Sequence, residues 1–157
     1  MSTWIAEDAV IFGDVSFGED CSVFYHSVIR AESGRFSFGR GTNIQDNCVI
    51  HGGSNYPVTV GEGVTIGHGC ILHGCTIGDN TLIGMGSIIM DGAQIGKNVI
   101  IGAGSLVPEH TMIPDNSVAY GRPAKVVRPI TEAEIESNRK GSEFYLSLKD
   151  LHAQKAV

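Results

Sequence analysis

The chain has 157 residues, 42% of them hydrophobic and 18% charged, a size that suits one soluble domain with a core and leaves no room for a second. Its net charge of −6 and its 11 scattered Lys and Arg residues exclude a general nucleic-acid surface, so a small molecule or another protein is the expected partner. No apolar run reaches the roughly 18 residues of a membrane span and the N-terminus MSTWIAEDAV lacks a basic region, so we expect a cytoplasmic protein without membrane contact.

Aliphatic or aromatic residues recur every six positions up to about residue 118, often followed at once by glycine. The register runs through Ile5, Ile11, Phe17, Val23, Ile29, Phe38, Ile44, Ile50, Val60, Ile66, Leu72, Ile77, Ile83, Ile89, Ile95, Ile101, Val107 and Ile113. Three intervals depart from six: 29 to 38, 50 to 60 and 72 to 77. This period is typical of a short strand and tight turn repeated as a solenoid, with three units to each coil of a triangular prism. Each residue then lies about 4.8 Å above the residue about 18 positions earlier.

Steps such as VTIGHG, IGDNTL, IGKNVI and IGAGSL resemble the hexapeptide-repeat left-handed parallel β-helix family. The resemblance implies an all-β fold and its left hand. Small residues four places after each repeat residue would point inward with it: Cys21, Cys48, Cys70, Ser87, Ala93, Val99, Ser105, Thr111 and Ser117. This places three of the four cysteines in the core. Because the chain has no CxxC spacing, we interpret all four, including Cys75, as reduced packing residues.

The repeats stop at AYGRPAKVVRP, so residues 1–120 are expected to form the β-helix domain and residues 121–157 a connector and C-terminal helix. TEAE at 131–134 has the form of a capping box that opens a helix. An apolar side, interrupted at Gly141, consists of Ile135, Tyr145, Leu148 and Leu151. We expect this helix to pack along the prism as a cap, and a disordered tail is the alternative.

The register of the six-residue repeat also predicts on which face of the prism each histidine lies. Arg30, His51 and His73 each directly follow a repeat residue on the same face, so they form one outward column. His68 is the third residue of its unit, on the preceding face, directly above Asp46. Two imidazoles about 4.8 Å apart can share a metal ion, and a threefold assembly can bring a third from a neighbouring chain. We therefore hypothesise a homotrimer in which His51, His68 and His73 from two chains bind one metal at each interface.

The remaining histidines, His26, His110 and His152, are interpreted as tolerated surface residues.

Three segments that carry these residues resemble the γ-class carbonic anhydrase-like family: VIRAESGRFSFGRGTNIQDNCVIHG, VTIGHGCILHGCTIGDNTLIGMGSIIMDGAQIG and GRPAKVVR. The resemblance extends from about residue 5 to 130, and the pairing of NIQDNCVIH with IGHGCILHG is its specific part. It implies a homotrimer with one Zn²⁺ or Fe²⁺ at each subunit interface, held by three histidines that map onto His51, His68 and His73. Arg30, Gln45 and Asp46 would lie near the metal, and Tyr120 joins them as a candidate catalytic residue.

Three neutral histidines leave a fourth metal position for water, whose pKa the ion lowers to about 7, and the resulting hydroxide can attack CO2 to give bicarbonate. Gln45 could orient that hydroxide, and Arg30 could pair with Asp46 across the interface. The chain departs from the family at Glu32, where Asp is usual. The loop GGSNYP after His51 also lacks the acids that carry the proton away in the best-known active members, which favours slow hydration or none without buffer.

Three other functions remain open. A metal-activated water could attack a thioester, which would make the protein a metal-dependent thioesterase on acyl-CoA esters. The trimer could also be a non-catalytic, metal-stabilised module. A hexapeptide acyltransferase is disfavoured, because such enzymes need a general-base histidine rather than three clustered ones. Fold resemblance alone does not separate these functions, since activity belongs to the site.

Overall fold

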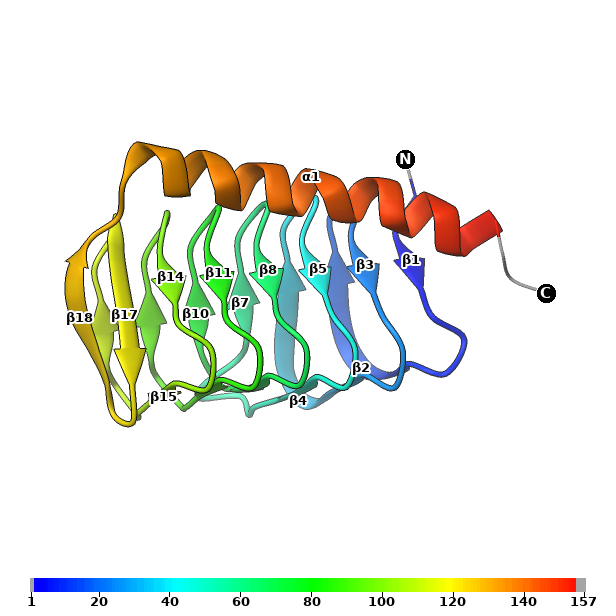
Figure 1. Cartoon of the computed structure of the whole chain (residues 1–157). Helices are drawn as coiled ribbons and strands as arrows, with labels where there is room; N and C mark the ends of the chain where they lie inside the picture. The colour runs from blue at the N-terminus through cyan, green and yellow to red at the C-terminus, as the bar shows by residue number, and fades with distance from the viewer. Residues whose placement is uncertain (1, 155–157) are drawn as a thin grey trace.

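The computed structural model describes residues 2–154 and shows a left-handed parallel β-helix with an α-helix along its side (Figure 1). The first sheet forms one flat side of the prism, called face A here. It contains β1 (Trp4–Ile5), β3 (Ser22–Val23), β5 (Asn43–Ile44), β8 (Thr65–Ile66), β11 (Leu82–Ile83), β14 (Ile100–Ile101) and β17 (Ser117–Gly121). An antiparallel strand, β18 (Ala124–Pro129), pairs with β17 and closes this end of the prism.

The second sheet bends around a corner and supplies the other two sides. Face B contains the first parts of β2 (Val10–Phe17) and β4 (Val28–Phe38), followed by β6 (Val49–His51), β9 (Ile71–His73), β12 (Ile88–Ile89) and β15 (Leu106–Val107). Face C contains the last parts of β2 and β4, followed by β7 (Thr59–Val60), β10 (Thr76–Ile77), β13 (Gln94–Ile95) and β16 (Met112–Ile113). The predicted fold class is therefore confirmed.

The strands pair in the register that the repeats predict, even where the interval departs from six. Ile29 pairs with Ile50, and Ile50 with Leu72, although an insertion separates each pair. The long step from 29 to 38 is a continuous strand, because β4 runs through the corner and pairs with β6 at its start and β7 at its end. Insertions thus lengthen the corners and leave the stacking of the coils intact.

The core consists of the repeat residues and the small residues between them. Thr111 is half-buried, whereas the other residues predicted to point inward are buried. Cys75 is buried as well, so all four cysteines lie in the core and not three. The shortened step explains the difference, because Cys75 stands two places before Ile77, the same place that Cys70 holds before Leu72. Burial raises the pKa of Cys48 and of Cys75 to about 12, which leaves these thiols protonated.

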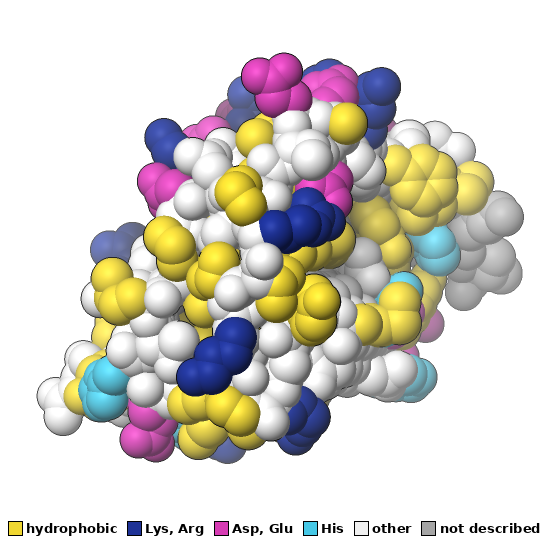
Figure 2. Space-filling view, turned by 60° about the vertical axis from the view of Figure 1, so that its left-hand side comes forward, with side chains coloured by type: hydrophobic (Ala, Val, Ile, Leu, Met, Phe, Trp, Pro, Cys, Tyr) yellow, Lys and Arg dark blue, Asp and Glu magenta, His cyan; other side chains and the backbone are white. Residues whose placement is uncertain are grey.

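The C-terminal helix α1 (Glu132–Gln154) runs back along the prism from β18 toward β1 (Figure 1). Its predicted capping box forms: the Thr131 N–H donates to Glu134 Oε2 at 2.9 Å, and the Glu134 N–H donates to Thr131 Oγ1 at 3.2 Å. The helix continues through Gly141 without a break. Figure 2 shows charged side chains gathered at the top of the view, over this helix. The ion pairs of the helix include those of Arg139 with Glu136 and Glu143.

The side of α1 that faces the prism is more polar than the predicted apolar pattern. Ile135, Tyr145 and Leu148 are half-buried, but Leu151 is exposed, because the neighbouring His152 takes the inward place. The His152 ring lies 5.6 Å from the Trp4 ring, and its Nδ1 is 2.8 Å from Tyr25 Oη. The interpretation of His152 as a surface residue is therefore wrong.

Asn138 and Lys149 are the polar anchors of α1. Asn138 donates its amide to the carbonyl oxygens of Asn80 and Val99 at 3.1 and 3.4 Å. Lys149 is 4% exposed, and its Nζ lies 3.2 Å from the Ser2 carbonyl oxygen and 3.5 Å from Asp20 Oδ1.

Among the described residues, no helix is both long and apolar enough to cross a membrane.

Replacing Lys149 by Ala is expected to lower the free energy of unfolding by about 2 kcal/mol, because the buried Asp20 loses its ammonium partner and keeps only the Arg40 guanidinium, whose Nη2 lies 3.8 Å from Asp20 Oδ2. Urea unfolding followed by circular dichroism measures the change. Lys140→Ala is the matched control, since Lys140 is exposed and its pair with Glu136 contributes less than about 1 kcal/mol. Equal stability of the two variants would show that the buried pair does not anchor the helix.

Candidate metal centre

The predicted column of Arg30, His51 and His73 exists on face B. Arg30 pairs with His51 in the ladder between β4 and β6, and His51 pairs with His73 in the ladder between β6 and β9. Each side chain points outward because the preceding repeat residue points into the core and side chains alternate along a strand. His51 Nδ1 and His73 Nε2 approach to 3.0 Å. Two ring nitrogens thus converge on one spot outside the prism.

A carboxylate holds one ring nitrogen of each predicted ligand. Glu32 Oε2 lies 3.2 Å from His51 Nε2, and Asp91 Oδ1 lies 2.5 Å from His73 Nδ1. The third histidine, His68, has Asp46 Oδ2 at 2.9 Å from its Nδ1. In metal sites a ligating histidine usually donates its other N–H to a carboxylate or carbonyl, which fixes the ring and its tautomer. The three histidines therefore share the surroundings of metal ligands.

The environment also favours the neutral form of His51. Burial lowers its pKa, and the nearby Arg30 guanidinium and the His73 ring lower it further. A neutral imidazole is the form that binds a metal ion. Arg30 itself is hydrogen-bonded to Glu32, so the Glu32 carboxylate lies between the guanidinium and the His51 ring.

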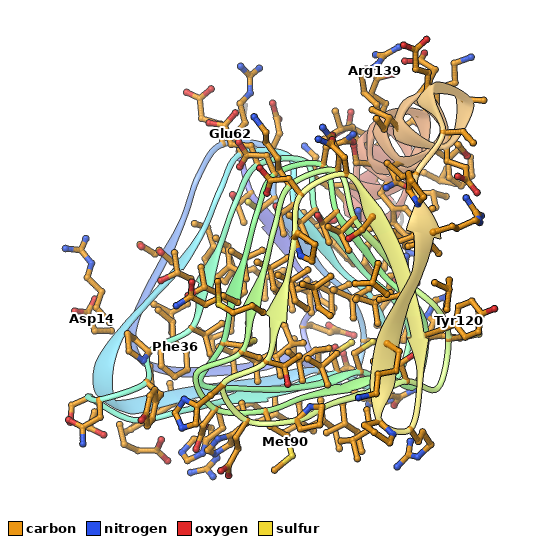
Figure 3. The ribbon with its side chains drawn as sticks, turned by 90° about the vertical axis from the view of Figure 1, so that its left-hand side faces the viewer. Asp14, Phe36, Glu62, Met90, Tyr120 and Arg139 are labelled. Atoms are coloured by element: carbon orange, nitrogen blue, oxygen red, sulfur yellow. The ribbon has the colours of Figure 1, made fainter. Side chains whose placement is uncertain are left out.

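His68 lies in the turn that follows β8 of face A and not with the other two histidines. Figure 3 looks along the prism and labels one residue near each of the two faces. Met90 stands one coil above His73 and marks face B, whereas Tyr120 marks face A on another side of the prism. Within residues 2–154, no group of three or more His, Cys, Asp or Glu side chains is arranged to hold a metal ion on one chain alone. The chain presents a pair of histidines on one side and a single histidine on another.

Gln45 and Tyr120 stand in one column of face A but far apart along it. Three glycines, Gly67, Gly84 and Gly102, occupy the coils between them. Gln45 is buried, donates its amide to Asn43 Oδ1 at 3.3 Å and lies beside His68 in a groove of about 420 Å³. Tyr120 is more than half exposed. The structure therefore brings Gln45 close to His68 and Asp46 and separates Tyr120 from them by four coils.

The loop after His51 forms one wall of a cavity of about 420 Å³ in front of the paired histidines. An isolated bridge between Gly53 and Tyr56 folds this loop back on itself. The loop lacks an acid, but Glu32 and Asp91 bring their carboxylates to the same cavity from β4 and from the turn after β12.

Sequence reasoning missed Asp91, because the coil from Leu72 to Ile89 has 17 residues and the repeat register places Met90, not Asp91, directly above His73.

Comparison with known proteins places the chain among hexapeptide-repeat proteins. A family model described as bacterial transferase hexapeptide (six repeats) matches residues 74–109, and one described as hexapeptide repeat of succinyl-transferase matches residues 57–89. A solved structure of a hexapeptide transferase family protein from Anaplasma phagocytophilum superposes with a TM-score of 0.85 at 39% identity, over 94% of this chain and 91% of that chain.

Two curated relatives carry a more specific name. The probable carbonic anhydrase of Methanocaldococcus jannaschii is 51% identical over 93% of this chain and 92% of its own length. The mitochondrial gamma carbonic anhydrase 2 of Arabidopsis thaliana is 37% identical over 97% of this chain, which spans 57% of that longer protein. The repeat architecture, the paired histidines and these identities together show that the chain belongs to the γ-class carbonic anhydrase-like family.

Proposed function

We propose that the protein is a homotrimer that holds one Zn²⁺ or Fe²⁺ at each interface and reversibly hydrates CO2. His51 and His73 of one copy and His68 of the next would hold the ion. The observation that carries the proposal is the convergence of His51 Nδ1 and His73 Nε2 at 3.0 Å, with a carboxylate on the far side of each ring. The names of the two curated relatives support the reaction.

The level of each histidine along the prism fits a threefold assembly. His68 follows β8 and His73 ends β9, and these strands belong to the same coil. A threefold axis parallel to the prism keeps every coil at its own height in all three copies. The His68 of one copy is therefore level with the His73 of its neighbour. No shift along the axis is needed to bring the three rings together.

Face B has the surface expected of a subunit interface. Its outward column is apolar in every coil and consists of Val10, Val28, Val49, Ile71, Ile88 and Leu106. The equivalent column of face C is mostly polar and consists of Ser16, Ser37, Thr59, Thr76, Gln94 and Met112. Val10, Val49 and Ile71 are all more than 40% exposed in the single chain. Burial of this column against a second copy would remove that apolar surface from water.

The donor set fits the proposed ion. Three neutral imidazoles are a ligand set of catalytic zinc sites, and they leave a position for one exchangeable ligand. When bound, the metal would supply a Lewis acid that lowers the pKa of a water ligand to about 7. Glu32, Asp46 and Asp91 would hold the histidine rings from behind. Gln45, beside His68 and Asp46, would present its side-chain amide to the reacting oxygen or to bicarbonate.

A metal-dependent thioesterase on acyl-CoA esters remains the second candidate function, because the same Lewis acid would serve it. The observation that favours a larger substrate is the groove of about 420 Å³ that opens beside His68 and Gln45 and has Met85 and Tyr145 in its lining. The transferase name of the superposed relative belongs to that protein, and the cluster of three histidines argues against a hexapeptide acyltransferase here. A cytoplasmic location stays a prediction.

Protein loaded anaerobically with Zn²⁺ or Fe²⁺ is expected to hydrate CO2 in stopped-flow measurements and to lose the activity on chelation. Because the loop after His51 has no acid, the rate should rise with buffer concentration. His68→Ala should abolish activity, whereas His26→Ala, at an exposed turn, should leave it unchanged. Wild-type protein that is loaded with metal but does not hydrate CO2 would contradict the proposal. Cleavage of acyl-CoA esters by that protein would then favour the thioesterase, and inactivity toward both would favour the binding module.

Mixing two inactive variants tests whether the site is shared between chains. His68→Ala and His73→Ala are each expected to lack activity. When the two are unfolded together and refolded as mixed trimers, roughly a quarter of the interfaces should combine an intact His51 and His73 pair with an intact His68. Activity should return to about that fraction of the wild-type value. Failure of the mixture to recover, with mixed trimers shown by native mass spectrometry, would rule out an interfacial site.

A further inference from the structure

Asp91 makes a contact that neither the repeat pattern nor the family comparison assigns. It begins the turn after β12, and its Oδ1 lies 2.5 Å from Nδ1 of His73, which ends the strand one coil below. The His73 ring then offers its other nitrogen, Nε2, to the spot where it meets His51 Nδ1. The contact therefore fixes which nitrogen of His73 points toward the proposed metal position.

Two other turns of the prism show what an Asp at this position ordinarily does. Asp79 and Asp115 each reach down over a glycine of the coil below, over Gly61 and Gly96. Each accepts the backbone N–H that follows that glycine: Asp79 Oδ1 from Glu62 at 2.8 Å, and Asp115 Oδ1 from Lys97 at 2.9 Å. These two carboxylates hold turns together. Asp91 also reaches over a glycine, Gly74, but its partner is a side chain.

The backbone at Gly74 makes this different partner possible. Gly61 and Gly96 directly follow their repeat residues, the place that His73 holds in its own coil, so Asp91 meets a side chain where Asp79 and Asp115 meet none. Gly74 is the next residue and adopts a φ of +60°, which favours glycine. A Cβ at Gly74 would collide with Asp91 Oδ1 and would lie 2.7 Å from the Cβ of Tyr56. The turn is also tied on both sides, since the Gly74 N–H donates to the His51 carbonyl oxygen and the Gly92 N–H donates to the Gly74 carbonyl oxygen. The carboxylate reaches His73 because residue 74 has no side chain.

We propose that Asp91 is a positioning residue for metal binding: it holds the His73 ring and its tautomer so that Nε2 faces the metal. This rests on the proposed function only in requiring that His73 binds a metal ion. A carboxylate on the outer nitrogen of a ligating histidine raises the basicity of the ligand, and its removal typically costs 10- to 100-fold in metal affinity. Asp91 contacts the nitrogen of His73 that faces away from the proposed metal position, so its effect on metal binding would act through His73.

The test measures the Zn²⁺ affinity of the full-length protein by competition with a chromophoric chelator. Asp91→Ala should weaken Zn²⁺ binding by about 10- to 100-fold. Asp91→Asn, which keeps an acceptor oxygen but loses the charge, should have an intermediate affinity and covers the case in which the alanine variant fails to fold. Asp115→Ala is the matched control, because it removes the same side chain from an equivalent turn without a histidine partner, and it should bind Zn²⁺ as the wild type does.

A second readout separates positioning from a general loosening of the turn. Long-range ¹H–¹⁵N correlation spectra recorded before metal addition should show His73 as the Nδ1–H tautomer in the wild type and in Asp115→Ala, and a mixture of tautomers in Asp91→Ala. Wild-type affinity and tautomer in Asp91→Ala would overturn the proposal, as would wild-type protein that does not bind Zn²⁺. Zn²⁺-loaded wild type that binds tightly but does not hydrate CO2 would contradict the proposed function and leave the role of Asp91 supported.

Discussion

Parallel backbone hydrogen bonds between successive coils determine where every functional side chain of this protein lies. They hold equivalent residues of neighbouring coils about 4.8 Å apart, a spacing at which two imidazoles can contact one ion. The ladders through β4, β6 and β9 place Arg30, His51 and His73 in line, although insertions separate their coils in the sequence. The insertions are accommodated at the corners, so the flat faces keep their register. The paired histidines are therefore held by hydrogen-bonded strands, with the loop of residues 52–57 beside them.

The repeat pattern predicts contacts within one element or between equivalent positions of neighbouring coils. It does not predict contacts that join different positions of two coils. The column of face B, the stacking of His68 on Asp46 and the capping box of α1 could all be predicted from the sequence, because each follows from spacing within one element or between equivalent positions. The contact between Asp91 and His73 could not, since it joins different positions of two coils and depends on the backbone conformation of Gly74.

The residues of α1 that contact the prism could not be predicted from the sequence for a similar reason. Lys149 and His152 contact the first coil, at Asp20 and Trp4, and no periodicity links the two ends of the chain.

The charges around the three histidines are consistent with a divalent cation. If the site is shared between two copies, Glu32 and Asp91 come from one chain and Asp46 from the other, with Arg30 as the nearby cation. The three carboxylates and one guanidinium then leave two negative charges around neutral imidazoles, which matches the charge of Zn²⁺ or Fe²⁺. In the separate chain, the residues that the structure describes form half-sites with two histidines on one side and one on another, and no group of three ligands is assembled. Metal binding and assembly would thus stabilise each other, because only the interface combines three imidazoles with a compensating charge.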